Sequence, residues 1–278
     1  MALSKVVTPL GQVYLFAAFP AEAKPLISHF KLKKELSVTA FTIYRNPEIT
    51  LTVTGLGKAA MAAGLAYTLA LFPAATVPIL LNVGIVGHQD QPLGSIFCAE
   101  KIIDQDSQRV YYPQLVATPP CPSQTLTTVS SPELAYAGTS LYEMEASAFY
   151  ETAIRFSSSE LIQCIKVVSD NQANPVAQIK PAQVSELIMM AIPVIKDYIN
   201  LLSQLALLSQ NFKVPFYTEI ITQAHFTNQQ KLQLKMLLSK RAVLMTHKLD
   251  LTELMQNSAK VIVEGLQQDI SQHKFGGF

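Results

Sequence analysis

Three acidic side chains, those of Glu22, Glu145 and Asp170, lie in otherwise apolar stretches of the chain. A carboxylate in such surroundings must find hydrogen-bonding partners or change its pKa. Asp170 follows an apolar stretch with the pattern of a buried strand, a position from which it could hand a proton to a ligand. The three residues are therefore candidates for general acid–base chemistry.

Each candidate also fits an ordinary structural role, and the residues alone leave both interpretations open. Pro20 is suited to the first position of a helix, which makes Glu22 an ordinary third-position residue of a helix start. Glu145 follows Glu143 by two residues, as expected for acidic groups near a helix N-terminus. Asp170 fits the end of a strand, where it could cap the next turn.

The hydrophobic pattern predicts strands that alternate with helices. Apolar runs indicate strands at 13–19, 41–45, 49–54, 79–84, 96–103, 126–129 and 161–168. Helical patterns cover 21–30, 58–72, 143–156 and 181–210. This order favours a three-layer αβα fold around a twisted, mostly parallel (mixed) central sheet, with ligands bound at the carboxyl ends of its strands.

The composition changes near the C-terminus. Residues 211–278 carry eight basic and five acidic groups, whereas residues 1–210 carry thirteen and fifteen. A heptad-like series at Leu232, Leu234, Leu237, Leu238 and Leu244 predicts a helix in this part. We expect an α/β domain over 1–210 and a helical C-terminal extension over 211–278.

The overall composition excludes several classes of protein. The 278 residues are 49% hydrophobic and 15% charged, with 21 basic and 20 acidic groups and three cysteines. These values argue against a disordered chain, a disulfide scaffold and an electrostatically driven nucleic-acid binder. We expect a cytoplasmic protein with a small-molecule ligand, and the sparse charge suggests a homo-oligomer, a dimer or larger.

One long uncharged stretch raises the question of a membrane span. No Asp, Glu, Lys or Arg occurs between Lys58 and Asp90. Pro73 and Pro78 interrupt the stretch, and Ala and Thr dominate where a spanning helix favours Leu, Ile and Phe. We therefore expect a buried helix followed by a buried strand, and no membrane partner.

Short motifs point to a particular chemistry. They are VYLFAAFPAE at 13–22, TGLGK at 54–58, NVGIVG at 82–87, EMEASA at 143–148 and VVSD at 167–170. In this order they resemble the nucleoside phosphorylase and nucleosidase superfamily, in particular the nucleosidases that cleave methylthioadenosine and S-adenosylhomocysteine. The resemblance covers residues 11–208 and implies a phosphorylase-like fold.

The resemblance also implies roles for individual residues in hydrolysis of the N-ribosidic bond of a purine nucleoside or 5′-thio-nucleoside. Asp170 would protonate the leaving base, Glu22 would activate water, Glu145 would hold the ribose hydroxyls, and Met144 would lie under the sugar. No metal or organic cofactor is required. The remaining residues expected at the substrate are Glu143, Ser169, Ile85, Val86 and Gly87.

Departures from the family pattern keep two alternatives open. The first loop lacks the Gly and Arg that bind phosphate in phosphorylases, and Asn82 stands where those enzymes carry Arg, so water is the expected nucleophile. Ile85 replaces a usual serine, with His88 as a possible substitute donor. A phosphate-dependent phosphorylase and a catalytically degenerate nucleoside-binding or interaction module remain the alternatives.

The segment between Asp104 and Glu143 is shorter than its counterpart in the family. It contains the loop that would contact the base. Tyr111, Tyr112 and Tyr136 are available for that contact. The base and the 5′ substituent are not fixed by the sequence.

Overall fold

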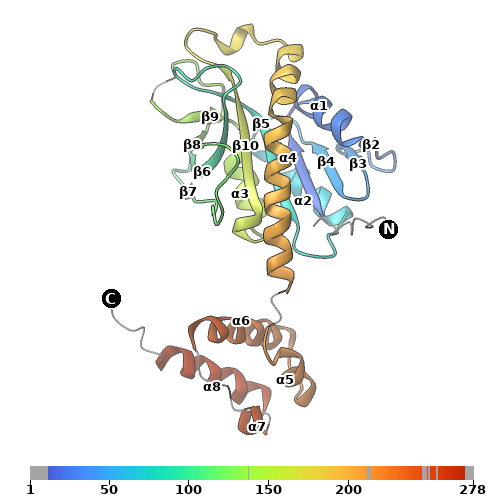
Figure 1. Ribbon diagram of the computed structural model, residues 1–278, viewed down its shortest axis with the longest axis vertical. Coiled ribbons are helices and arrows are strands. Elements are labelled where there is room, and N and C mark those ends of the chain that lie inside the picture. The colour runs from blue at the N-terminus through green and yellow to red at the C-terminus, as the bar shows by residue number, and fades with distance from the viewer. Residues whose placement is uncertain are drawn as a thin grey trace, which may run out of the picture. The chain divides into compact units, whose positions relative to one another are not determined.

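A computed structural model describes residues 12–136, 138–211, 214–245, 249, 251–254 and 256–272 (Figure 1). The chain forms two compact units, Met1–Gln210 and Asn211–Phe278. Each unit has a hydrophobic core of its own.

The first unit alternates strands and helices, as the hydrophobic pattern predicts. Its strands are β1 (Val13–Ala17), β2 (Lys33–Lys34), β3 (Thr42–Arg45), β4 (Ile49–Val53), β5 (Ile79–Gly87), β6 (Ile96–Asp104), β7 (Val110–Tyr111), β8 (Ser123–Thr128), β9 (Leu141–Glu143) and β10 (Ile162–Asp170). Its helices are α1 (Pro20–Phe30), α2 (Lys58–Leu71), α3 (Ala146–Ala153) and α4 (Pro181–Asn211), with 3₁₀ turns at Ser159–Leu161 and Val176–Gln178.

The strands form one mixed sheet in the order β10-β6-β8-β9-β5-β1-β4-β3-β2, with β7 paired to β6. The pairs β4–β1, β1–β5, β5–β10, β6–β8 and β8–β9 are parallel, whereas β2–β3, β3–β4, β5–β9, β6–β7 and β6–β10 are antiparallel. Because β10 pairs with both β5 and β6, the strands β5, β10, β6, β8 and β9 close into a ring.

Helices cover both faces of the sheet, which confirms the predicted three-layer arrangement. Residues of α1 and α4, such as Leu26 and Ile195, share one core with Leu15 of β1. Residues of α2 and α3, such as Leu65 and Phe149, form the other core. All residues of β1 and β10 are buried, as expected for strands covered on both sides.

The uncharged stretch that follows Lys58 forms the helix α2 and the strand β5, as the sequence predicts. Within the described residues a different helix, α4, is long and apolar enough over Pro181–Leu208 to cross a membrane, by length and composition alone. In the structure α4 crosses the sheet (Figure 1). Its apolar side contributes Ile188, Ile195 and Leu202 to the core.

The second unit contains the helices α5 (Tyr217–Gln223), α6 (Asn228–Leu244), α7 (Leu251–Leu254) and α8 (Ala259–Gln272). Helix α6 begins with a capping box between Thr227 and Gln230. Within the predicted leucine series, Leu234, Leu237 and Leu238 are buried against α8, whereas Leu232 is 71% exposed and faces away from this core.

Helix α2 permits a direct test of the packing. Leu65 is fully buried beneath the sheet, whereas Leu71 of the same helix is 46% exposed. We expect Leu65→Ala to lower the free energy of unfolding by about 2–5 kcal/mol, because it removes buried methyl groups and leaves a cavity. Leu71→Ala is the matched control, with an expected change within about 0.5 kcal/mol in urea denaturation followed by circular dichroism. Equal losses in the two variants would contradict the placement of α2.

Candidate active site

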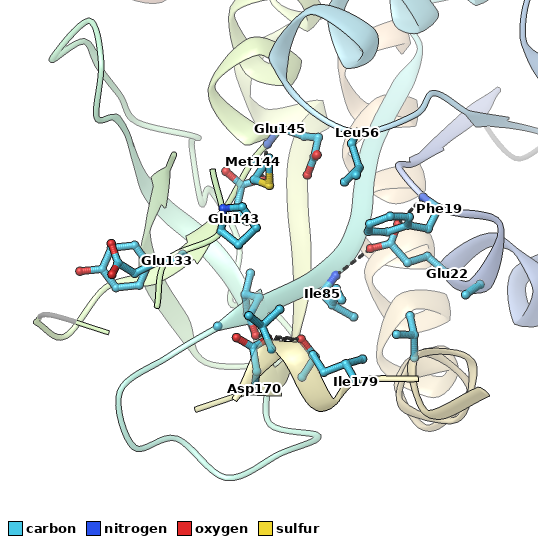
Figure 2. A pocket seen from close by; sticks show the side chains of 18 of the residues that line it. Phe19, Glu22, Leu56, Ile85, Glu133, Glu143, Met144, Glu145, Asp170 and Ile179 are labelled. Carbon is cyan, nitrogen blue, oxygen red and sulfur yellow. Dashed lines mark hydrogen bonds between the residues drawn. The ribbon is translucent and has the colours of Figure 1, made fainter. Parts of the chain in front are cut away.

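A pocket of about 510 Å³ lies where β1, β5, β9 and β10 end (Figure 2). Most of its wall is apolar and includes Phe19, Leu56, Val129, Ile179 and Val184. The nine residues expected at the site from the sequence all line this one pocket: Glu22, Ile85, Val86, Gly87, Glu143, Met144, Glu145, Ser169 and Asp170.

Glu22 is held in the first turn of α1 by three backbone groups. Its Oε2 accepts hydrogen bonds from the N–H groups of Ala18 and Phe19, both at 2.9 Å, and its Oε1 accepts one from Ile85 N at 3.0 Å. Burial raises the pKa of Glu22, although these hydrogen bonds and nearby Lys166 oppose that effect. The residue therefore serves the helix start and also presents a carboxyl group to the pocket.

The close approach of Glu22 to the sheet requires a glycine in β5. A Cβ atom on Gly84 would lie 2.9 Å from Glu22 Oε1 and 3.4 Å from Lys166 Nζ. The first distance is shorter than real Cβ contacts, so a side chain here would push the carboxylate away. Gly84 therefore makes room for a charged group.

Glu143 is fully engaged with the protein. Its Oε2 accepts hydrogen bonds from Glu145 N at 2.9 Å and Ala146 N at 2.7 Å, and its Oε1 accepts one from Thr128 Oγ1 at 2.5 Å. The predicted helix start at Glu143 is wrong, because Glu143 ends β9 and α3 begins at Ala146. The carboxylate satisfies the first N–H groups of α3 from outside the helix.

Glu145 occupies the N-cap position of α3 instead of a place inside the helix. Its Oε1 accepts a hydrogen bond from Gly57 N at 2.7 Å, and its carboxylate points into the pocket (Figure 2). Burial, together with the charge of Glu143, raises the pKa of Glu145 to about 7. Near neutral pH the group can therefore accept or donate a proton.

Lys166 is an important group that the sequence analysis missed. It lies in the middle of β10, only 1% exposed, and its Nζ is 3.1 Å from Glu143 Oε2. Burial opposes its charge, but Glu143, Glu145 and Glu22 raise the pKa of Lys166 to about 12. A lone lysine within the apolar strand IQCIKVVSD was the available signal, because a buried ammonium requires anionic partners.

Hydroxyl groups surround Asp170. Ser169 Oγ donates to Oδ1 at 2.6 Å, and Tyr136 Oη donates to Oδ2 at 2.6 Å. Of the other candidates near the base, Tyr111 donates to Glu151, and Tyr112 is largely exposed. His88, the suggested substitute donor, accepts from Asp90 N and Gln91 N through Nδ1, and it does not line the pocket.

The pocket therefore contains two different acidic environments. On one side, Glu22, Glu143 and Glu145 lie near a buried ammonium group. Asp170 lies on another side of the pocket (Figure 2). There it accepts hydrogen bonds from the neutral hydroxyl groups of Ser169 and Tyr136. Such an arrangement can stabilise positive charge developing on a ligand near the cluster and can supply a proton at Asp170.

No protein-family model matches the sequence, and no curated protein matches it. Solved structures do match its fold. Arabidopsis thaliana 5′-methylthioadenosine nucleosidase matches with a TM-score of 0.59 over 70% of this chain and 97% of that chain, at 15% identity.

Two further solved structures give similar values. The Streptococcus pneumoniae 5′-methylthioadenosine/S-adenosylhomocysteine nucleosidase has a TM-score of 0.53 and covers 68% of this chain and 98% of its own, at 19% identity. Helicobacter pylori futalosine hydrolase has a TM-score of 0.55, with 69% and 98% coverage at 10% identity. These matches confirm the fold that the motifs predict.

The raised pKa of Glu145 predicts how stability depends on pH. Because the pKa in the folded protein, about 7, exceeds the ordinary value of 4.5, the folded state binds the proton more tightly. The stability that this tighter proton binding gives the folded protein is fully present below about pH 4.5, and it is lost as the pH rises through about 7. Glu145→Gln removes this titration. Between pH 5 and pH 8 the wild type should therefore lose about 2.5 kcal/mol relative to the variant.

Urea denaturation at the two pH values provides the measurement. Glu48→Gln is the matched control, because Glu48 is exposed and lies outside the pocket. A pH-independent difference for Glu145→Gln would show that Glu145 does not titrate in this range.

Proposed function

We propose that this pocket hydrolyses the N-ribosidic bond of a purine nucleoside or 5′-thio-nucleoside. The observation that carries the proposal is that Asp170 and the acidic cluster of Glu22, Glu143 and Glu145 line different sides of one apolar pocket (Figure 2). Breaking this bond creates positive charge on the sugar and negative charge on the base. The reaction therefore needs carboxylates near the ribose and a proton donor near the base.

Each carboxyl group has a defined task in the proposed reaction. As the bond between C1′ and N9 breaks, its electron pair passes to the base, and Asp170 gives a proton to N7. A water oxygen forms the new bond to C1′, and Glu22 takes the proton of that water. Glu145 accepts hydrogen bonds from the ribose hydroxyls, and Met144 packs under the sugar. Solvent then returns the proton from Glu22 to Asp170.

The charges at the site favour water over phosphate as the nucleophile. None of the residues lining the pocket in the described part of the chain is a lysine, an arginine or a histidine. Asn82 is buried away from the pocket, and its Nδ2 donates to Phe16 O. A phosphate dianion near Glu22 would be repelled by the neighbouring carboxylates. The ammonium group of Lys166 could not offset this repulsion, because it is already paired with Glu143.

The apolar wall suits a ligand with an apolar substituent. Phe19, Pro20, Ile179 and Val184 together offer a surface without charge. Solved structures with the same fold include an enzyme that binds 5′-methylthioadenosine. A 5′-thioether would bury its sulfur and alkyl group on such a surface more favourably than a charged phosphate ester would.

A second candidate function rests on Ile85. Its backbone N–H donates to Glu22, but its side chain is apolar at the point where a nucleophilic water needs hydrogen-bonding partners. This observation favours a protein that binds nucleosides without cleaving them. Titration calorimetry with adenosine-type ligands distinguishes the candidates, because a binding module gives heat of binding and no free base.

The nucleosidase proposal is tested with a panel of purine nucleosides and 5′-thio-nucleosides. Base release is followed by chromatography with and without phosphate, and we expect the same rate in both. Asp170→Asn and Glu22→Gln should each lower kcat about 100- to 10,000-fold, because each removes a proton-transfer group.

Asp197→Asn is the matched control for Asp170→Asn. Asp197 lies exposed on α4 and does not line the pocket, so this variant should keep the wild-type rate. Base release that requires phosphate, or full activity in Asp170→Asn, would contradict the proposed mechanism.

A further inference from the structure

Tyr136 is held in an unusual way between β8 and β9. It is the only buried residue in the segment 130–136, and its neighbour Leu134 is 71% exposed. Its backbone is left-handed, with φ of 48°, a conformation that is strained for an aromatic residue. Such a conformation persists only where other contacts compensate for it.

Those contacts come from the phenol hydroxyl. Tyr136 Oη donates to Asp170 Oδ2 at 2.6 Å and accepts from Val176 N at 3.2 Å. Because the N–H of Val176 occupies an acceptor position, the phenol proton is directed at Asp170. Burial, together with the bond to Asp170, raises the pKa of Tyr136 to about 12, so the phenol remains protonated at neutral pH.

Gly87 provides the space for this arrangement. A Cβ atom at Gly87 would lie 2.6 Å from Asp170 Oδ2 and 2.9 Å from Tyr136 Cε1. Any side chain at this position would therefore separate the phenol from the carboxylate. The pairing of Tyr136 with Asp170 depends on a glycine at the end of β5.

Ser169 can stay hydrogen-bonded to Asp170 whether or not the carboxyl group carries a proton. The single hydroxyl proton of Ser169 has two possible acceptors, Asp170 Oδ1 at 2.6 Å and Val86 O at 3.3 Å. When Asp170 is ionised, Ser169 donates to Oδ1. When Oδ1 carries a proton, that proton can point to Ser169 Oγ while the serine donates to Val86 O. Tyr136 donates to Oδ2 in both states, and its bond is stronger to the ionised form.

From these contacts we infer that Tyr136 is a positioning residue for Asp170: it fixes the carboxyl group through Oδ2 and sets its strength as an acid. The inference rests on the proposed function, in which Asp170 is the proton donor. The same tyrosine anchors the segment that brings Pro132 and Glu133 to the pocket wall. Orientation of the acid is thereby tied to the shape of the pocket.

Other titratable groups surround this end of the pocket and must be kept constant in a test. Glu133 lies on the segment that carries Tyr136, and His88 and Asp90 follow β5. The remaining charged groups around the pocket are Glu22, Glu143, Glu145 and Lys166. None of them is altered by Tyr136→Phe, which removes one hydroxyl group.

The test compares the pH profiles of Tyr136→Phe and the wild type. Loss of the donor to the ionised carboxylate makes Asp170 a weaker acid. The alkaline limb of the profile of kcat against pH should therefore move to higher pH by about one unit. At the optimum pH, kcat should be several-fold lower than in the wild type, and KM should stay within about twofold. Tyr111→Phe is the control, because Tyr111 bonds to Glu151 outside the pocket and its loss should leave the profile unchanged.

A second variant keeps the phenol and reverses the expected direction. Site-specific 3-fluorotyrosine at position 136 has a more acidic hydroxyl, so it donates a stronger hydrogen bond and should move the alkaline limb to lower pH. An unmoved limb in both folded variants would overturn the inference, even if kcat falls, because a structural role of the segment alone would lower kcat without moving the limb.

A measurement without substrate separates this inference from the proposed function. The titration of Asp170 is followed by infrared difference spectroscopy of the ligand-free protein, with Asp170→Asn identifying its band. We expect the midpoint in Tyr136→Phe to be about one pH unit above that of the wild type. If no nucleoside is cleaved but this shift is seen, only the proposed function fails. If nucleosides are cleaved and the midpoint stays in place, only the role of Tyr136 fails.

Discussion

The buried ion pair between Lys166 and Glu143 is the interaction on which the rest of the pocket depends. Glu22, Glu143 and Glu145 are all nearly inaccessible to solvent, and three uncompensated carboxylates in such a place would either protonate or unfold the region. The ammonium group of Lys166 reduces that cost from within the sheet. Glu143 is also tied to the first N–H groups of α3, so the same ion pair fixes the start of this helix and the position of Glu145.

The ring of strands β5, β10, β6, β8 and β9 explains why groups distant in sequence meet at one place. β5 ends at Gly87, β9 ends at Glu143, and β10 ends at Asp170, and pairing within the ring places these three ends side by side. Two glycines of β5 then leave space for polar groups, Gly84 beside Glu22 and Gly87 beside Asp170. A strand with side chains at both positions would form the same sheet, but the carboxyl groups could not approach it.

The two acidic environments of the pocket differ in a way that suits proton transfer. A buried ammonium group compensates the charge of the cluster around Glu143, whereas the oxygens of Asp170 accept hydrogen bonds from the hydroxyl groups of Ser169 and Tyr136. A hydroxyl group both donates and accepts hydrogen bonds, so it can stay bonded to a carboxyl group whether or not that group carries a proton. One pocket can therefore hold carboxylates that accept hydrogen bonds and a carboxyl group that gives up a proton.

The sequence by itself determined the alternation of strands and helices, the two-sided burial of the sheet and nine residues of the pocket. The first two features depend on local hydrophobic periodicity, which a single chain displays directly. The pocket residues follow from the resemblance of short motifs to a known family. Only the tertiary structure decided that Glu143 ends a strand, that Lys166 compensates the carboxylates and that Tyr136 holds Asp170. Lys166 and Glu143 are 23 residues apart in the sequence, and Tyr136 and Asp170 are 34 residues apart. No local pattern specifies which buried groups will meet once the sheet closes into a ring.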